Sequence, residues 1–346
     1  MKITKLLFLA LASSILFVSC SNDDDSTPDI PLGIYDNGVL IVNEGGTSGG
    51  TISFINNDLT AFENNIFNAV NPSQGIGIYV QSIFFDGDRA FIVSNGSNKI
   101  TVVNRYTFEF IGKIETGFNV PRYGVVENGK AFVTNLASFT DLTDDFVSVI
   151  DLNTLQVEST IMMNAAAERI LSENGKVYVA NGSYGAGSTI TVINAANKTI
   201  ESTINLGMSP NSLEEKNGFL YVLCSNYVTD SKIIKINLAT NQLVSEIAMI
   251  GLVNAQNFNI EDDKMYFTVN SSVYSQNLNA TTINTTPLFT STATTLYGFT
   301  VENGNIYVGD AKDYASDGEV FIYNLTGTLQ EQFSVGLIPN GFYFNN

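Results

Sequence analysis

The residues best suited to chemistry are polar side chains that recur at one place in each sequence repeat, at the start of a strand. Counting back from each hairpin turn gives the candidate ligand-binding residues Gln81, Arg122, Tyr123, Glu168, Arg169, Asn211, Gln256, Asn257, Tyr297 and Asn340. Amide, guanidinium and phenol groups of this kind suit a neutral, amide-rich or sugar-like ligand. The alternative is that they bond only to neighbouring loops and to channel water.

Aromatic residues in long loops form a second set of binding candidates on the same face. Loops are expected at 44–50, 135–145, 181–188, 225–231 and 309–318, and the last four contain Phe139, Tyr184, Tyr227 and Tyr314. Exposed loop aromatics suit flat ligands or protein partners. The alternative is that each ring folds onto its own loop.

Catalytic chemistry finds little support. The chain has no histidine, which excludes a Ser-His-Asp triad, a histidine-based zinc site and imidazole acid–base chemistry. Glu168 between Arg122 and Arg169 could be catalytic, but such a group is more often a structural ion pair. No nucleophile and base can be paired, so we expect no enzyme and no cofactor.

Acidic residues gather in the same long loops and raise the question of a metal. They are Asp141, Asp144, Asp145, Asp230, Asp313 and Asp317. The segment 140–145 lacks the glycine-centred pattern of a calcium-binding EF-hand loop. We expect a solvated acidic rim and no metal, with calcium as the alternative.

Charge and composition exclude several classes of partner. The 346 residues carry a formal net charge of −18 and only 14% charged residues. Nucleic acids and anionic membrane surfaces both need a basic face, so neither is expected as a partner. The many Asn, Thr, Ser, Gly and Tyr residues favour strands joined by polar turns.

One short apolar strand recurs seven times and indicates the fold. The copies begin at residues 39, 90, 131, 177, 220, 265 and 306, separated by 51, 41, 46, 43, 45 and 41 residues, which is the period of propeller blades. Five copies follow an Asn-Gly or Asp-Gly pair, which favours a tight hairpin. One strand precedes each copy except the first across this turn, and two further strands follow each copy, so each repeat predicts a four-stranded antiparallel meander.

The two ends of the repeat region predict how the ring closes. The first repeat begins at residues 37–38 with its second strand, and the spare strand 340–344 stands at the end of the chain. This strand fits as the missing inner strand. The fold class is therefore an all-β seven-bladed β-propeller of four-stranded antiparallel blades over residues 35–346, closed by the C-terminal strand.

The N-terminus predicts export and lipid anchoring. Lys2 and Lys5 precede the apolar segment 6–17, which is too short for a transmembrane helix, so residues 1–19 are expected to be a lipoprotein signal peptide. Cys20 is the predicted lipidation site, and residues 20–34 form an acidic, polar tether. The other cysteine, Cys224, is expected to be a buried core residue.

The repeats at 148–151, 177–181 and 191–194 (SVID, VYVAN, TVIN) resemble the "YVTN" or YncE-like propellers. With the acidic lipoprotein start, the chain resembles Bacteroidetes surface propeller lipoproteins, some of which capture cobalamin on a TonB-dependent transporter. This resemblance implies outer-membrane anchoring facing the cell exterior. A periplasm-facing lipoprotein with a plain spacer is the alternative.

Three functions follow for the chain. The first is a surface module that captures a nutrient, by resemblance cobalamin or a related corrinoid, for a TonB-dependent transporter. The second is a protein- or glycan-interaction scaffold. The third is a propeller lyase or lactonase, which the absence of histidine disfavours.

Overall fold

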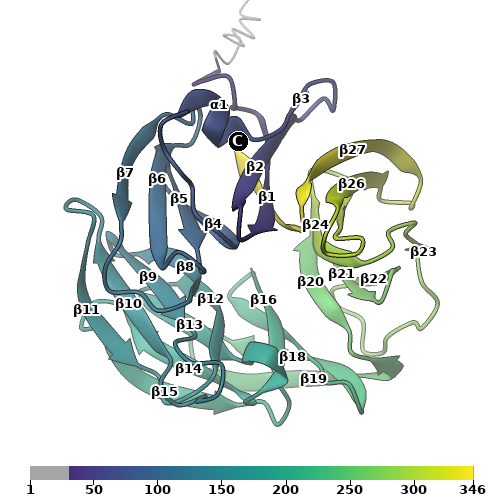
Figure 1. The fold of residues 1–346 in the computed structure, drawn as a ribbon. Coiled ribbons are helices and arrows are strands. Elements are labelled where there is room, and N and C mark those ends of the chain that lie inside the picture. The colour runs from purple at the N-terminus through teal and green to yellow at the C-terminus, as the bar shows by residue number, and fades with distance from the viewer. Residues whose placement is uncertain (1–30, 346) are drawn as a thin grey trace, which may run out of the picture. The chain divides into compact units, whose positions relative to one another are not determined.

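The chain folds into seven four-stranded antiparallel sheets arranged around a common centre (Figure 1). The computed structural model describes residues 31–345, so the predicted signal peptide 1–19, the lipidation site Cys20 and most of the tether lie outside the described residues. The predicted all-β seven-bladed propeller is confirmed. Within residues 31–345, no helix is long and apolar enough to cross a membrane.

Each blade is built from an inner, a second, a third and an outer strand. The inner strands are β28 (Pro339–Asn345), β4 (Val80–Asp86), β8 (Pro121–Glu127), β12 (Ala167–Glu173), β16 (Pro210–Lys216), β20 (Gln256–Glu261) and β24 (Leu296–Glu302). The second strands are β1 (Gly38–Gly46), β5 (Arg89–Ser94), β9 (Lys130–Asn135), β13 (Lys176–Asn181), β17 (Phe219–Cys224), β21 (Lys264–Val269) and β25 (Asn305–Asp310). These second strands contain the seven apolar copies seen in the sequence.

The third and outer strands complete the meanders. The third strands are β2 (Gly49–Asn56), β6 (Lys99–Asn104), β10 (Phe146–Asp151), β14 (Thr189–Asn194), β18 (Asp230–Asn237), β22 (Ser272–Asn277) and β26 (Asp317–Asn324). The outer strands are β3 (Phe62–Glu63), β7 (Phe110–Ile114), β11 (Gln156–Met162), β15 (Thr199–Asn205), β19 (Gln242–Val253), β23 (Phe289–Thr290) and β27 (Leu329–Leu337). The outer strands of two blades, β3 and β23, are thus only two residues long.

The core lies between neighbouring blades. The second strands are buried on both faces, which explains why they read as continuous apolar runs and not as alternating ones. Phe84 and Phe91, for example, stack with ring centroids 4.8 Å apart and pack with Ile150 and Leu152 of the next blade. Cys224 at the end of β17 is fully buried, as expected.

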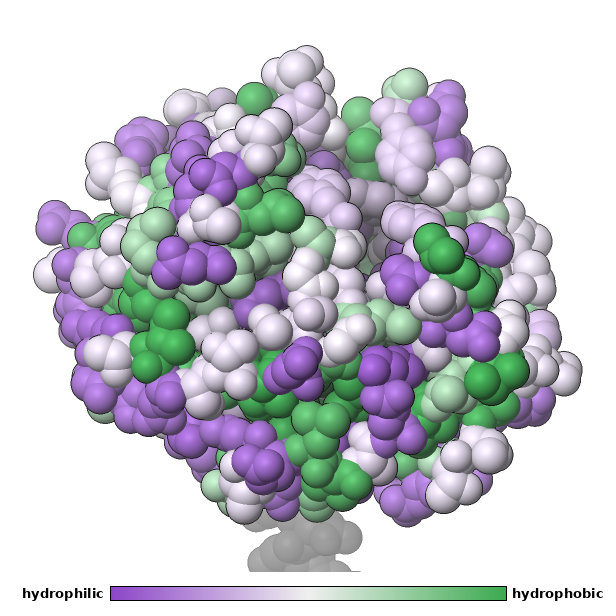
Figure 2. All heavy atoms as spheres, turned by 90° about the horizontal axis from the view of Figure 1, so that it is seen from below, coloured by the Kyte–Doolittle hydropathy of each residue, from purple (hydrophilic) through white to green (hydrophobic). Residues whose placement is uncertain are grey.

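The outer surface is mixed in character. Viewed from below, hydrophobic groups are interspersed among hydrophilic ones (Figure 2). Outer strand β19 contributes the exposed apolar residues Leu243, Val244 and Ile250. Scattered exposed apolar residues are normal for a protein surface.

Two local features differ from the sequence-based expectation. The short helix α1 (Ile66–Val70) between β3 and β4 has no counterpart in the repeat pattern. The segment 44–50, expected as a loop, is mostly strand, because β1 runs to Gly46 and β2 begins at Gly49. Only the tip of this hairpin projects from the sheet.

The C-terminal strand closes the ring, as the sequence predicted. Strand β28 pairs with β1 from Gly38 opposite Asn345 to Val42 opposite Gly341, and Figure 1 shows the two chain ends side by side in this sheet. Asn345 then ties the closure to the next blade: its amide donates to the carbonyl oxygens of Tyr35 at 2.6 Å and Arg105 at 2.7 Å. The Arg105 guanidinium donates to the Asn345 side-chain oxygen and, at 3.0 Å, to the Phe344 carbonyl.

Removing the hydrogen bonds of Asn345 should destabilise the whole propeller. We expect Asn345→Ala to lower the free energy of unfolding by about 2–3 kcal/mol, because two carbonyls and a guanidinium lose their partner. Denaturant unfolding followed by circular dichroism measures the change, with exposed Asn279→Ala as the matched control. Equal stability of the two variants would show that the closure does not depend on Asn345.

Candidate functional site

A register irregularity stands at the start of every inner strand. In each blade one extra inner-strand residue separates the first pair of the ladder from the next, which is a β-bulge. The residues outside the regular pairing are Gln81, Arg122, Tyr123, Glu168, Arg169, Asn211, Asn257, Phe258, Tyr297 and Asn340. Bulges re-aim side chains and are enriched beside functional sites. All predicted inner-strand candidates except Gln256, which is paired, therefore fall at bulges.

Hydroxyl groups of adjacent strands satisfy the backbone groups that the bulges leave free. Ser82 donates to the Arg122 carbonyl at 2.7 Å. Thr134 donates to the Glu168 carbonyl at 2.8 Å and accepts the Tyr123 N–H at 3.1 Å. Because buried backbone groups need partners, these bonds hold the bulges in one conformation.

Arg122 and Glu168 form the strongest charged contact of the site. The Arg122 Nη2 lies 2.6 Å from Glu168 Oε1, and Nε lies 3.1 Å from both carboxylate oxygens. The side chains are only 13% and 14% exposed. Burial disfavours the charged guanidinium, but the Glu168 carboxylate outweighs this and raises the pKa of Arg122 above its usual range. The geometry is that of a structural ion pair.

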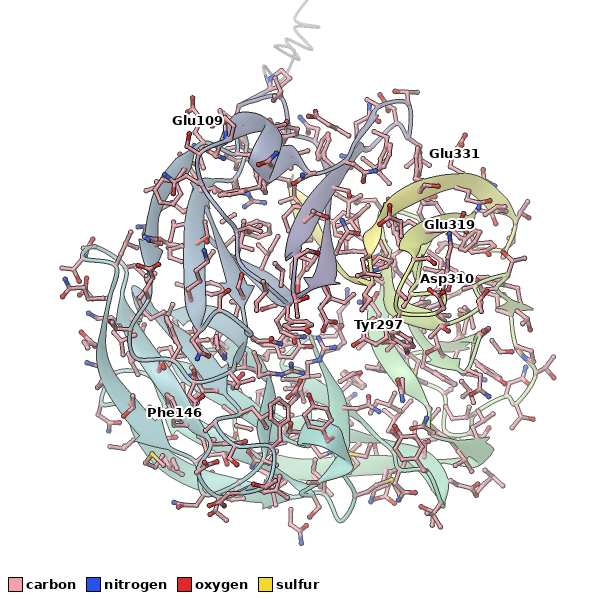
Figure 3. All side chains as sticks on the ribbon, viewed as in Figure 1. Glu109, Phe146, Tyr297, Asp310, Glu319 and Glu331 are labelled. Carbon is pink, nitrogen blue, oxygen red and sulfur yellow. The ribbon has the colours of Figure 1, made fainter. Side chains whose placement is uncertain are left out.

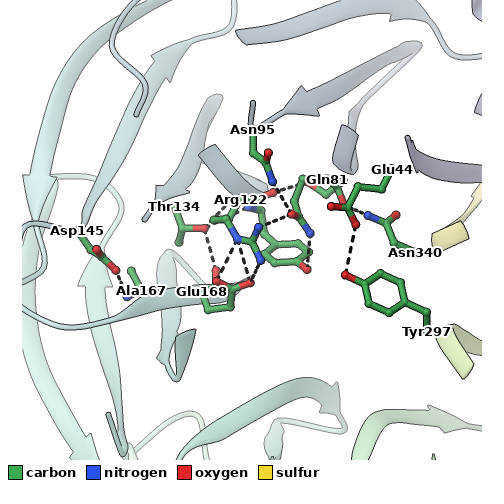
Figure 4. Close-up of polar contacts among 12 residues, drawn as sticks. Glu44, Gln81, Asn95, Arg122, Thr134, Asp145, Ala167, Glu168, Tyr297 and Asn340 are labelled. Carbon is green, nitrogen blue, oxygen red and sulfur yellow. Dashed lines mark hydrogen bonds and ion pairs between the residues drawn. The ribbon is translucent and has the colours of Figure 1, made fainter. Parts of the chain in front are cut away.

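Gln81 extends this pair into a network, shown in Figure 4. Its side-chain oxygen accepts hydrogen bonds from Arg122 and, at 2.9 Å, from Asn95. Its amide donates to the Tyr123 hydroxyl at 2.9 Å. Residues of three blades are thereby held in a fixed arrangement above the channel.

Glu44, Tyr297 and Asn340 form a second cluster on the other side of the site. Tyr297 donates to Glu44 at 3.3 Å, and Asn340 also bonds to this carboxylate. Burial raises the pKa of Glu44. Figure 3 shows Tyr297 toward the centre of the ring, while Glu109 and Glu331 lie at its outer edge. Asn340 further donates to the carbonyls of Val80 and Gln81.

The three remaining amide residues mostly bind their neighbours. Asn211 donates to the Ser225 hydroxyl at 2.6 Å and the Ala255 carbonyl at 2.8 Å, and Asn257 donates to Thr268 at 3.1 Å. Gln256 donates to Asn254 at 3.2 Å. The N–H donors of these three side chains therefore follow the alternative given in the sequence analysis, because they bond to neighbouring residues of the protein.

Two cavities are lined by these residues. The first, here called the mouth cavity, has a volume of about 290 Å³ and is lined by Arg122, Glu168, Arg169, Tyr184, Asn211, Tyr227, Gln256 and Asn257 among others. The second, the channel cavity, has about 280 Å³ and is lined by Gln81, Tyr123, Arg169, Glu214, Asn257, Asn340 and Tyr343 among others. Arg169, Ser212 and Asn257 line both cavities.

A larger cleft of about 760 Å³ lies away from these residues. It is lined by the β1–β2 hairpin, helix α1, the segment 74–78 and parts of β26 and β27, and glycines form much of its wall. None of the predicted binding residues lines it. We place the candidate site at the mouth because the predicted inner-strand residues, Arg122, Glu168 and Arg169 among them, line the two smaller cavities.

The predicted loop aromatics are exposed. The exposed fractions are 63% for Phe139, 70% for Tyr184, 77% for Tyr227 and 49% for Tyr314. Tyr184 and Tyr227 line the mouth cavity. Phe139 contacts Tyr184 with ring centroids 5.8 Å apart, and Tyr314 meets Tyr297 edge-on at 5.6 Å. Phe139, Tyr184 and Tyr314 therefore each contact a ring from another segment and do not fold onto their own loops.

The acidic loop residues do not all form a solvated rim. Asp145 is fully buried, and burial raises its pKa to about 7. Its carboxylate accepts the Ala167 N–H at 2.7 Å and so fixes the start of β12, directly before Glu168. Within residues 31–345, no group of three or more His, Cys, Asp or Glu residues is arranged to hold a metal ion.

Sequence reasoning did not select Glu44 and Asn95, although both take part in the central networks. Each follows the end of a repeated apolar strand copy within one residue, as Asn43-Glu44 and Ser94-Asn95. Aligning the seven copies at that position could have found them.

Comparison with known families places this fold. A family model described as a domain of unknown function, DUF5074, matches residues 37–329. The chain belongs to this DUF5074 family. No curated protein matches the chain.

Solved structures share the architecture at low sequence identity. A Bacteroides fragilis protein described as a candidate 6-phosphogluconolactonase is 13% identical, with a TM-score of 0.66 over 90% of this chain and 99% of that one. BamB from Moraxella catarrhalis is 13% identical, with a TM-score of 0.52 over 88% and 85%. The dihydro-heme d1 dehydrogenase NirN is 13% identical, with a TM-score of 0.57 over 91% and 77%. At such identities the likeness concerns the fold alone.

The buried ion pair should contribute far more to stability than an exposed one. Glu168→Gln leaves the Arg122 charge without its counterion, so we expect a loss of about 3 kcal/mol in the free energy of unfolding. Glu115→Gln, which removes the exposed pair with Lys113, should cost less than about 1 kcal/mol. Urea unfolding of both variants measures this, and equal losses would contradict the assigned burial.

Proposed function

We propose that this chain is a cell-surface lipoprotein that captures a nutrient at the mouth cavity for a TonB-dependent outer-membrane transporter. Cobalamin or a related corrinoid is our single best candidate for the nutrient. The observation that carries the proposal is the convergence of amide, guanidinium and phenol groups from several inner strands on one mouth. A corrinoid carries amide groups around its ring, and amide, guanidinium and phenol side chains can form hydrogen bonds with them.

The size of the mouth cavity fits a ligand that rests on the surface. Its volume of about 290 Å³ is at the lower end of the roughly 300–1,000 Å³ of pockets that enclose drug-sized molecules. A corrinoid would therefore lie over the mouth with one edge inside. The exposed Tyr184 and Tyr227 rings stand at the rim, where they could contact its flat face.

Preorganisation supports binding over catalysis. Arg122, Glu168 and Gln81 are fixed by hydrogen bonds to one another, so little side-chain entropy is lost when a ligand arrives. The absence of histidine removes imidazole ligation of cobalt, so recognition would rest on shape and hydrogen bonds. A lyase or lactonase remains our third candidate, since no nucleophile–base pair is formed by the residues described here.

Anchoring in the outer membrane is part of the proposal. It rests on the sequence of residues 1–34, where a short apolar segment, Cys20 and an acidic tether follow one another. Lipid attachment at Cys20 would keep the propeller at the membrane without a spanning helix.

A protein- or glycan-interaction scaffold is the second candidate. The observation that favours it is the high exposure of Tyr227 and Val228, 77% and 85%, on one loop at the mouth. Exposed aromatics of this kind are enriched at protein interfaces. Pull-down from outer-membrane extracts separates the candidates: a co-purifying TonB-dependent barrel favours uptake, and an adhesin or polysaccharide favours the scaffold.

Calorimetric titration with cyanocobalamin tests the proposed nutrient. We expect saturable binding that weakens about fivefold in Tyr184→Ala and Tyr227→Ala, because each loses one aromatic contact of about 1 kcal/mol. Leu243→Ala on outer strand β19 is the control and should bind as the parent protein does. No heat with correctly folded protein would remove cobalamin from consideration.

A further inference from the structure

We propose that Arg169 forms an anion-binding subsite where the mouth and channel cavities meet, and that it takes a carboxylate or phosphate group of the ligand. This inference deepens the proposed function and rests on it for the place of binding. It does not depend on which nutrient is bound.

Three of the four arginines are fully engaged within the fold. Arg89 pairs with Asp86, Arg105 donates to Asn345 and Arg122 pairs with Glu168. Arg169 differs, because among residues 31–345 it makes no hydrogen bond and no ion pair, and its recorded contact is with the Tyr123 ring. A guanidinium carries five N–H donors, so those of Arg169 remain available to a ligand.

The position of Arg169 suits a ligand group. It belongs to the β12 bulge, its side chain is exposed, and it lines both cavities. Its guanidinium carbon lies 4.1 Å from the centre of the Tyr123 ring. Such stacking holds the guanidinium and leaves its N–H edges free for bidentate contact with a carboxylate or phosphate.

The charge of Arg169 is not neutralised by its surroundings. Glu168, the adjacent residue, is engaged on both oxygens by Arg122. Glu214 is the other carboxylate lining the channel cavity, where it accepts a hydrogen bond from Asn259 at 3.1 Å. Burial raises the pKa of Glu214 to about 8 and so favours its neutral form, while the charge of Arg169 acts in the opposite direction. Among residues 31–345, no carboxylate lies within ion-pair distance of Arg169, so its charge is available to an anionic group.

The overall charge of the chain does not oppose this assignment. A net charge of −18 repels anions at long range, but salt screens such interactions beyond roughly 8 Å at physiological ionic strength. Inside the cavity the nearest guanidinium dominates. The positive charge inside the cavity therefore favours an anionic ligand group, although the protein as a whole is acidic.

Binding of phenyl phosphate tests the subsite. This probe combines an anionic group with a ring for the rim tyrosines, and benzyl alcohol is its neutral counterpart. We expect phenyl phosphate to bind the parent protein and to bind Arg169→Gln at least tenfold more weakly, while benzyl alcohol does not distinguish the two. Arg169→Lys keeps the positive charge but loses the bidentate guanidinium, so its affinity for phenyl phosphate should be intermediate. Lys264→Gln, at the start of β21 in another blade and at the end of that blade away from the mouth, is the control for the change in net charge.

A chemical readout keeps the test independent of variant folding. Phenylglyoxal modifies available arginines, and peptide mass mapping of the unmutated protein should show Arg169 as the most reactive of the four, protected by phenyl phosphate. Undiminished binding to Arg169→Gln, no binding to the parent protein, or no protection of Arg169 would each overturn the proposal.

The outcome is separable from that of the proposed nutrient. If cyanocobalamin does not bind but phenyl phosphate protects Arg169, the subsite stands and the corrinoid assignment fails. If cyanocobalamin binds while Arg169→Gln leaves phenyl phosphate binding unchanged, the capture function stands and the anion subsite fails.

Discussion

The pairing of β28 with β1 is the constraint on which the rest of the structure depends. Blade 1 has no inner strand until the last residues of the chain supply one, so the ring exists only when the two ends meet. Asn345 and Arg105 join this closure to the next blade through hydrogen bonds across about 240 residues of sequence. Closure also brings Asn340 beside Val80 and Gln81, so it completes the site as well as the fold.

A repeated β-bulge gives this closed ring its polar mouth. Because the extra residue comes at the same place in each blade, side chains from all seven inner strands are displaced from the regular ladder near one mouth. Most of them bond to one another or to neighbouring residues, as in the Arg122–Glu168–Gln81 network. Arg169 instead stacks on the Tyr123 ring, and in our proposal its N–H groups would orient an incoming ligand.

The sequence alone was sufficient for the fold and for selecting inner-strand residues that the fold brings together at one mouth. Asn-Gly turns and the seven apolar strands have a local physical cause, so counting from them found the inner-strand residues without knowledge of tertiary contacts. The choice of partners was not predictable in this way. Whether Glu168 pairs with Arg122 or Arg169, and whether Asp145 is buried, depends on how neighbouring blades pack. Helix α1 lies between repeats, where no periodic signal exists.

If our proposal is correct, the ligand binds at the mouth formed by the seven inner-strand starts. A crystal structure of the protein grown with cyanocobalamin would locate the ligand. We expect ligand density over the mouth cavity, against Tyr184 and Tyr227 at the rim and with an anionic group toward Arg169. Density in the 760 Å³ cleft beside helix α1, or on the outer strands, with the mouth empty, would contradict it.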